Sequence, residues 1–144
     1  MSHVVVDDAI IPWSNSVTYL GVTLTNTLSW DTHVFNIISR ANTALYRLKI
    51  YKHLFSPLVR SRLVSSLICP IFDYCCTLLT DVTETDNLRL HKAFNGCVRF
   101  ILKVKWYEHI TPHYQKLRWL KLKLRRTFFV EIYSYMILEL TVEL

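Results

Sequence analysis

Glycine and proline are scarce in this chain. Its 144 residues include two glycines and four prolines, where average usage would give about ten and about seven. The two glycines, Gly21 and Gly96, stand alone, which excludes a glycine-rich loop that cradles phosphate. Because so few residues interrupt the long periodic runs, we expect a mainly helical fold. Apolar residues make up 51% of the chain, which is enough for a packed core and argues against disorder.

The four cysteines lack the spacing of a zinc or redox site. No C-x-x-C pair is present, and we find no secretory signal ahead of the mature sequence. We therefore expect an intracellular protein, nuclear or cytoplasmic, and not a secreted one. Its thiols should be reduced and packed in the core as small apolar side chains. These cysteines are Cys69, Cys75, Cys76 and Cys97.

No apolar run is long enough to span a bilayer. The longest covers residues 63–79 and is interrupted by Pro70 and Asp73, whereas a transmembrane helix needs about 20 clean apolar residues. We expect this segment to be core, and we expect no membrane partner.

Patterns that carry catalysis or bind metal are also missing. His109 and His113 have the i,i+4 spacing of a zinc-binding helix, but Pro112 lies between them and no H-E-x-x-H motif is present. Asp7 and Asp8 lie between two apolar runs, yet the partner carboxylates that a two-metal site needs are too few nearby. The pair also suits an ordinary turn. We predict no catalytic residue, no metal site and no cofactor within this chain.

Positive charge is concentrated in one part of the chain. Residues 89–126 contain eleven Lys or Arg and one acid, a net +10, while the rest carries six bases and ten acids, a net −4. Such segregation is typical of a surface that faces a polyanion. A solvated helical face is the alternative, and charge alone does not separate the two.

The first 25 residues have β character. Residues 4–6 and 10–11 flank a turn, and residues 17–24 alternate in polarity, which predicts a third short strand. Its apolar face, with Leu20, Val22 and Leu24, should pack on the core. Gly21 within this run indicates a bulge or a close approach of another part of the chain.

From Trp30 onward the apolar spacing alternates between three and four residues. This spacing predicts an amphipathic helix of about five turns that begins near Asp31. Ser56 followed by Pro57 predicts the start of a second helix, which the Cys69-Pro70 pair should end or kink. Thr83 is the predicted N-cap of a third helix.

The third helix has two distinct faces. Its apolar stripe comprises Leu90, Phe94, Cys97, Val98 and Ile101. Its opposite face comprises Arg89, Lys92, Gly96, Arg99 and Lys103. The glycine on that basic face either lets a ligand approach the backbone or is a tolerated weak point, and the second reading is slightly favoured.

A second basic stripe is predicted further along the chain. It comprises Arg118, Lys121 and Arg125, and Arg126 follows directly. Trp106 and Trp119 nearby are candidates for stacking on bases, although burial in a helical core is the preferred interpretation.

Several motifs follow one another in the order of a known family. They are "VVVDDAIIPWSNSVTYLGVTL" at residues 4–24, "LSWDTHV" at 28–34, "ICPIFDYCC" at 68–76, "LHKAFNGCVRFIL" at 90–102 and "YEHITPHYQKLRWLKLKLRR" at 107–126. In this order, they resemble the C-terminal part of reverse transcriptases from non-LTR retrotransposons of the jockey-like group. The fourth motif has Phe94 where that family usually has Gln. The resemblance covers about residues 3–140.

The resemblance implies a place within a polymerase. Residues 1–28 would be the end of the palm, with Tyr19, Leu20 and Gly21 in a primer-grip-like hairpin. Residues 29–144 would be the helical thumb and its C-terminal extension. The fingers and the catalytic palm strands would lie upstream of this chain. Asp8 precedes Leu20 by twelve residues, far fewer than separate the family's metal-binding pair from this strand, so the resemblance also makes Asp7-Asp8 a turn.

These observations lead to a functional hypothesis. We expect a fragment of an RNA-directed DNA polymerase that is inactive alone, contacts RNA template and DNA primer, and depends on Mg²⁺ only within its intact parent. Backbone contacts would come from Arg89, Lys92, Arg99, Lys103, Arg118, Lys121, Arg125 and Arg126. The alternative is a helical protein-interaction module, or a non-functional remnant, without a role in nucleic-acid binding.

Overall fold

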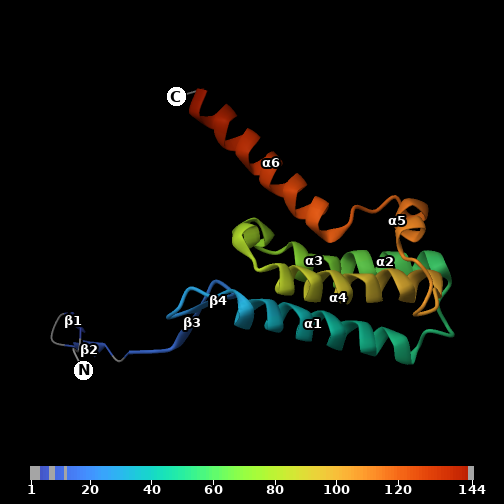
Figure 1. Cartoon of the computed structure of the whole chain (residues 1–144), viewed down its shortest axis with the longest axis horizontal. Coiled ribbons are helices and arrows are strands. Elements are labelled where there is room, and N and C mark those ends of the chain that lie inside the picture. The colour runs from blue at the N-terminus through green and yellow to red at the C-terminus, as the bar shows by residue number, and fades with distance from the viewer. Residues whose placement is uncertain (1–3, 7–8, 12, 143–144) are drawn as a thin grey trace.

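The N-terminal segment forms two antiparallel hairpins. The computed structural model describes residues 4–6, 9–11 and 13–142. In it β1 (Val4–Val6) pairs with β2 (Ala9–Ile11), and β3 (Ser16–Tyr19) pairs with β4 (Val22–Thr25). Figure 1 shows the first hairpin lying apart from the helices and the second resting against the start of α1 (Asp31–Ile50). The predicted turn at Asp7-Asp8 lies outside the described residues.

The single strand predicted for residues 17–24 is wrong, because the chain reverses in the middle of it. Leu20 and Gly21 have φ angles of +46° and +78°, and they form the tip between Tyr19 and Val22. Two consecutive left-handed residues are typical of a tight two-residue hairpin turn. The expected apolar face is therefore divided: Val22 is buried, whereas Leu20 is 73% exposed.

The close approach expected at Gly21 does exist, and its partner is a side chain. A Cβ added at Gly21 would lie 3.3 Å from Cε1 of Tyr74. The Tyr74 hydroxyl donates a hydrogen bond of 2.6 Å to the carbonyl oxygen of Leu20. Tyr74 follows α3 (Cys69–Asp73), so this contact ties the hairpin tip to the helical body.

The rest of the chain is helical, as predicted. After α1 come α2 (Pro57–Leu67), α3, the short 3-10 helix η1 (Cys76–Asp81), α4 (Glu84–Leu102), α5 (Thr111–Leu117) and α6 (Leu122–Val142). The first helix begins at Asp31, as its spacing indicated. The Ser56 hydroxyl accepts from the N–H of Val59 at 3.3 Å, and that of Thr83 accepts from Asp86 at 3.2 Å. Both predicted N-caps are therefore confirmed.

The core forms around α4, which packs against α1 and α2 (Figure 1). Its predicted apolar stripe is confirmed, because Leu90, Phe94, Cys97, Val98 and Ile101 are all buried. The ring of Phe94 lies at the centre and contacts three other aromatic rings. Its centroid is 5.3 Å from that of Phe72, 6.2 Å from that of Tyr114 and 5.9 Å from that of Trp119.

The cysteines follow the expectation for packed thiols. All four are free, three of them are buried, and Cys75 is half-buried. Burial raises the pKa of Cys69 to about 11 and that of Cys97 to about 12. These thiols stay protonated at neutral pH and are poor nucleophiles or metal ligands.

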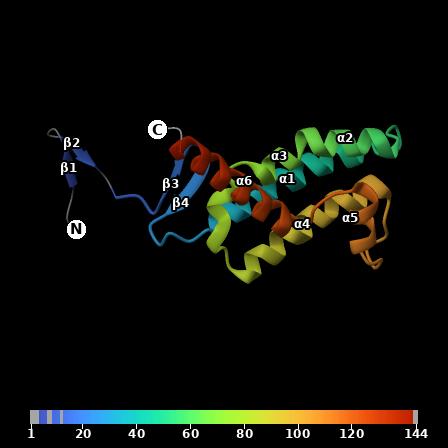
Figure 2. The same cartoon turned by 90° about the horizontal axis from the view of Figure 1, so that it is seen from above.

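The helix α6 is attached to the body only near its start. Arg125 donates from Nε and from its terminal nitrogen to the two Asp73 oxygens at 2.5 and 2.6 Å. Arg126 donates to the carbonyl oxygen of Leu79 at 2.7 Å and to Oδ1 of Asn87 at 3.0 Å. Beyond these residues α6 leaves the bundle (Figure 1). Figure 2, the view from above, shows it crossing over the other helices. Within the described residues, no helix is both long and apolar enough to cross a membrane.

We predict that Arg125→Lys loosens α6. Lysine keeps the charge but cannot make the two parallel hydrogen bonds to Asp73, so the free energy of unfolding should fall by about 1–2 kcal/mol. Urea denaturation measures this change. Arg62→Lys, on the exposed side of α2, is the matched control and should leave stability unchanged. Equal effects of the two replacements would contradict the structural role of the bidentate pair.

A buried histidine joins the second hairpin to α1. His33 is 4% exposed, and its Nδ1 accepts a hydrogen bond of 3.3 Å from the N–H of Thr23. Burial, helped by the charge of Arg40, lowers the pKa of His33 below its ordinary 6.5. The folded state thus favours neutral imidazole, which keeps an acceptor for the Thr23 N–H.

Acid should therefore release the hairpin. The pKa of His33 is lower in the folded than in the unfolded state. Neutral His33 therefore stabilises the folded hairpin fully above about pH 6.5, and this stabilisation is lost as the pH falls below that value. Hydrogen exchange of the Thr23 amide should accelerate between about pH 6.5 and 5, beyond the intrinsic dependence of exchange on pH. His33→Asn retains an acceptor that does not titrate in this range. An identical acceleration in that variant would show that another group is responsible.

Candidate nucleic-acid interface

The basic face of α4 lies along its contact with α1. Two hollows follow this line of contact, which we call the α1–α4 seam. The first, of about 520 Å³, is lined by Val34, Phe35, Ile38, Asn42, Arg89, Lys92 and Ala93. From Arg89 to Lys103 the seam is about 21 Å long at 1.5 Å per residue. That length matches about six nucleotides of one strand at 3.4 Å each.

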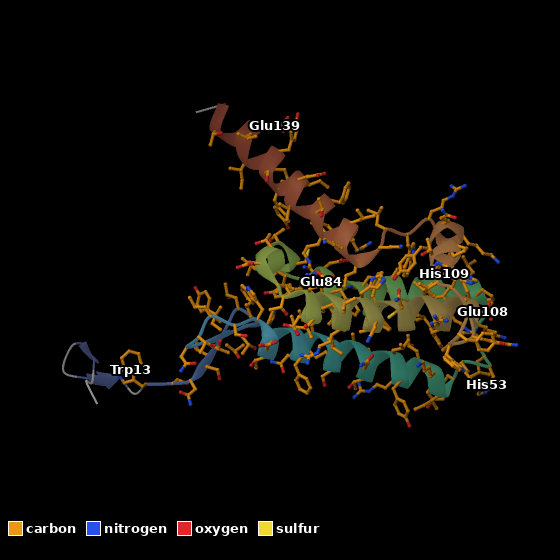
Figure 3. All side chains as sticks on the ribbon, viewed as in Figure 1. Trp13, His53, Glu84, Glu108, His109 and Glu139 are labelled. Carbon is orange, nitrogen blue, oxygen red and sulfur yellow. The ribbon has the colours of Figure 1, made fainter. Side chains whose placement is uncertain are left out.

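The second hollow is larger and strongly basic. This basic groove, of about 720 Å³, is lined by Lys49, Lys52, His53, Arg60, Gly96, Arg99, Phe100, Lys103, Val104 and Lys105. Six of these residues are Lys or Arg, and none is Asp or Glu. Figure 3 shows His53 at the turn after α1, at the end of the bundle where the α4–α5 connection carries Glu108. The groove therefore lies where the ends of α1 and α4 meet the start of α2.

Arg99 holds one wall of the basic groove in place. Its guanidinium donates to the carbonyl oxygens of Lys105 and Glu108, the latter at 3.0 Å. The Lys105 N–H in turn donates to Oε1 of Glu108 at 3.1 Å. These bonds fix the connection after α4, so that Lys103 and Lys105 line the groove from a defined backbone.

Lys103 has an unusual backbone conformation for a lysine. It is the C-cap of α4, with a φ of +57°, and the N–H of Val104 donates to Arg99 O at 3.1 Å. Glycine is the residue preferred at such a left-handed helix end. Arg118 occupies the equivalent place after α5, with a φ of +55°. A basic residue stands at both positions in place of the favoured glycine.

The eight predicted backbone-contact residues divide into two groups. Arg89 pairs with Asp86 at 3.1 Å, and Arg99, Arg125 and Arg126 hold parts of the chain together, as described above. The side chains of the other four form no hydrogen bond or ion pair with the residues that the structure describes: Lys92, Lys103, Arg118 and Lys121. The lysines of the seam are thus available to a ligand, whereas its arginines are occupied.

The predicted sites are not all in one place. Lys121 and Arg126 line a third hollow, of about 290 Å³, between the start of α4 and that of α6. Arg118 lines none of the three hollows described here. The primer-grip residues Tyr19, Leu20 and Gly21 form the exposed tip of the second hairpin. The structure therefore brings Arg99 and Lys103 together and separates them from the hairpin tip.

Sequence reasoning named only two of the six basic residues of the groove, Arg99 and Lys103. Lys49, Lys52 and Arg60 come from α1, its following turn and α2, outside the part of the chain where charge is concentrated. The sequence does contain a sign that Arg60 is buried. It precedes the buried residues Val64 and Ile68 at spacings of four, so it lies on the apolar face of its helix. An arginine in register with an apolar stripe indicates a buried charge that needs partners.

The two candidate tryptophans have different environments. Trp119 is half-buried against Phe94, as the preferred interpretation held. Trp106 is 83% exposed, so the expectation of burial is wrong for it. It follows Lys105 of the basic groove, and its ring meets that of Tyr107 edge to face at 5.7 Å.

Among the described residues, no three His, Cys, Asp or Glu side chains gather in a way that suits a metal ion. His113 Nε2 lies 4.0 Å from Oε2 of Glu108.

Comparison with protein-family models, curated proteins and solved structures found no match to this chain.

We predict that Gly96→Ala stabilises the protein by about 1 kcal/mol. A Cβ at Gly96 would lie 3.5 Å from Cδ2 of Leu45, an ordinary contact, and alanine favours the helical backbone. Gly21→Ala is the contrasting variant. It should destabilise the protein, because φ at Gly21 is +78° and an added Cβ would lie 3.3 Å from Cε1 of Tyr74. Thermal unfolding compares the two variants. A loss of stability in Gly96→Ala would contradict the prediction and show that the close packing of α1 on α4 requires a glycine at this position.

Proposed function

We propose that this chain is the late-palm and thumb region of a reverse transcriptase of the non-LTR retrotransposon kind. In this role it binds the phosphates of template and primer along the α1–α4 seam. The observation that carries the proposal is the coincidence of three features on one side of α4: the basic stripe, the first hollow and the basic groove. The motif order described above supplies the link to the polymerase family.

The chemistry of the seam suits a sugar–phosphate backbone. Lys92 and Lys103 are exposed cations without a partner in the described chain, and lysine binds phosphate as a flexible point charge. Such contacts position a strand without reading its sequence. The exposed ring of Trp106 adds a surface on which an unpaired base can stack. The expected ligand is therefore an RNA–DNA hybrid bound with little sequence preference.

One observation favours the alternative of a protein-interaction module. The outer part of α6 exposes apolar side chains on more than one side, among them Phe128, Tyr135, Met136, Ile137 and Leu138. An exposed apolar patch of this kind is typical of a protein contact surface. Association through it would be insensitive to salt, whereas binding through the seam would weaken steeply as salt rises.

The seam can be tested with a matched pair of double variants. Lys92→Gln with Lys103→Gly removes two cations from the seam and places glycine at a left-handed helix end, so the fold should be as stable as before or more stable. Affinity for an RNA–DNA hybrid should fall about tenfold at low salt. The slope of log affinity against log salt should become shallower by roughly two, because two phosphate contacts are lost.

Lys116→Gln with Arg118→Gly is the control. It removes the same charge and makes the same backbone change at the end of α5, away from the seam. Fluorescence anisotropy across a salt series measures both variants, and the control should bind the hybrid with an almost unchanged slope. If both variants weaken binding equally, the α1–α4 seam is not the binding surface.

A further inference from the structure

Arg60 is a buried cation without a carboxylate partner in the part of the chain that the structure describes. It is 2% exposed, and its guanidinium donates to the carbonyl oxygens of Phe100, at 3.4 Å, and Lys52. Its carbon Cζ lies 5.5 Å from the centre of the Phe100 ring. The Nε atom has no hydrogen-bond partner in the described chain. Carbonyl oxygens and an aromatic ring satisfy part of this group, but no carboxylate among the described residues forms an ion pair with it.

The same residue lines the basic groove, where five more Lys or Arg side chains gather. Buried charges in proteins are normally paired. Here positive charge comes from α1, its following turn, α2, α4 and the connection after α4, and no acid lines the groove. Cations from so many segments, converging on one hollow, repel one another unless an anion lies between them.

We propose that the basic groove is a pocket for a multiply charged phosphate group. This is a phosphate monoester, such as the end of a strand bound along the seam, or a free polyphosphate; the singly charged diesters of the strand interior would bind along the rest of the seam. A monoester carries a charge of about −1.5 to −2 at neutral pH, and a polyphosphate carries more. The first hollow of the seam provides two basic residues, Arg89 and Lys92, at the spacing of successive helical turns, which suits diesters. The groove instead has six basic residues around a volume of about 720 Å³.

The ligand can reach the groove at its exposed rim. Lys52 and Lys105 are exposed and come from different segments, one after α1 and the other after α4. Arg60 forms the buried base, held by the carbonyl oxygens of Lys52 and Phe100. An anion in the groove would therefore contact the ammonium groups of Lys52 and Lys105 and would lie in the field of the Arg60 guanidinium.

The proposal does not depend on strand binding, and it has its own test. Inorganic tripolyphosphate is titrated into the whole chain at low salt, with calorimetry for affinity and thermal unfolding for stabilisation. Wild type should bind it and unfold at a higher temperature in its presence. Lys52→Gln with Lys105→Gln should bind about tenfold more weakly, because two charge-assisted contacts are lost. Both residues are exposed, so the fold should be retained.

Arg62→Gln with Lys116→Gln is the control, since it removes the same charge from exposed positions outside the groove. It should bind tripolyphosphate as wild type does. If both double variants bound tripolyphosphate equally weakly, the loss of affinity would be due to net charge alone, and the proposal would be overturned. Absence of tripolyphosphate binding by wild type at low salt would also overturn it.

A second arm distinguishes the source of the phosphate. Two oligonucleotides of one sequence are compared, one with a 5′-phosphate and one with a 5′-hydroxyl. Tighter binding of the phosphorylated strand, lost in Lys52→Gln with Lys105→Gln, would assign the groove to a strand end. Equal binding of the two strands, with tight binding of tripolyphosphate, would assign it to a free polyphosphate. Lys103 lines both the seam and the groove, so hybrid binding is also measured for Lys92→Gln alone. Failure of that variant to alter hybrid binding would overturn the seam proposal and leave this result unaffected.

Discussion

The burial of one face of α4 is the constraint on which the rest of the structure depends. The five apolar side chains of its predicted stripe are removed from water between α1, α2 and the segments that follow α4. Each such side chain contributes about 1.5–3 kcal/mol. Because residues three and four apart share a face, burying Phe94 and its neighbours turns Arg89, Lys92 and Lys103 outward. The position of the seam is therefore a consequence of how the core packs.

Arginine and lysine have different roles in this protein. Arg60, Arg99 and Arg126 donate to carbonyl oxygens at helix ends or in connections, and Arg125 makes a bidentate pair with Asp73. A planar guanidinium with five donors suits this work, whereas lysine is a compact charge on a flexible stem. These four arginines thus hold segments of the chain together, whereas the side chains of Lys92 and Lys103 have no hydrogen-bond or ion-pair partner among the described residues. Counting charge along the sequence does not reveal this division.

Two apolar surfaces lie outside the helical bundle, both toward the end where α1 begins (Figures 1 and 2). The second hairpin exposes Tyr19 and Leu20 at its tip, and the outer half of α6 exposes several large side chains. Figure 3 shows Trp13 beyond that hairpin and Glu139 far out on α6. A polymerase parent would provide surfaces to cover both, and so would a separate protein partner. The basic groove lies away from both, at the end of the bundle where α1 and α4 finish.

The sequence by itself determined the mainly helical class, the start of α1, the caps at Ser56 and Thr83, and the two faces of α4. These features depend on local rules, namely apolar spacing and hydrogen bonds between residues three apart in the chain. Only the tertiary structure decided the reversal at Leu20-Gly21, because alternating polarity continues through a tight turn unchanged. It also decided which basic residues share the groove. Lys49, Arg60 and Lys105 are far apart along the chain, and they meet only because α1, α2 and α4 pack side by side around Phe94.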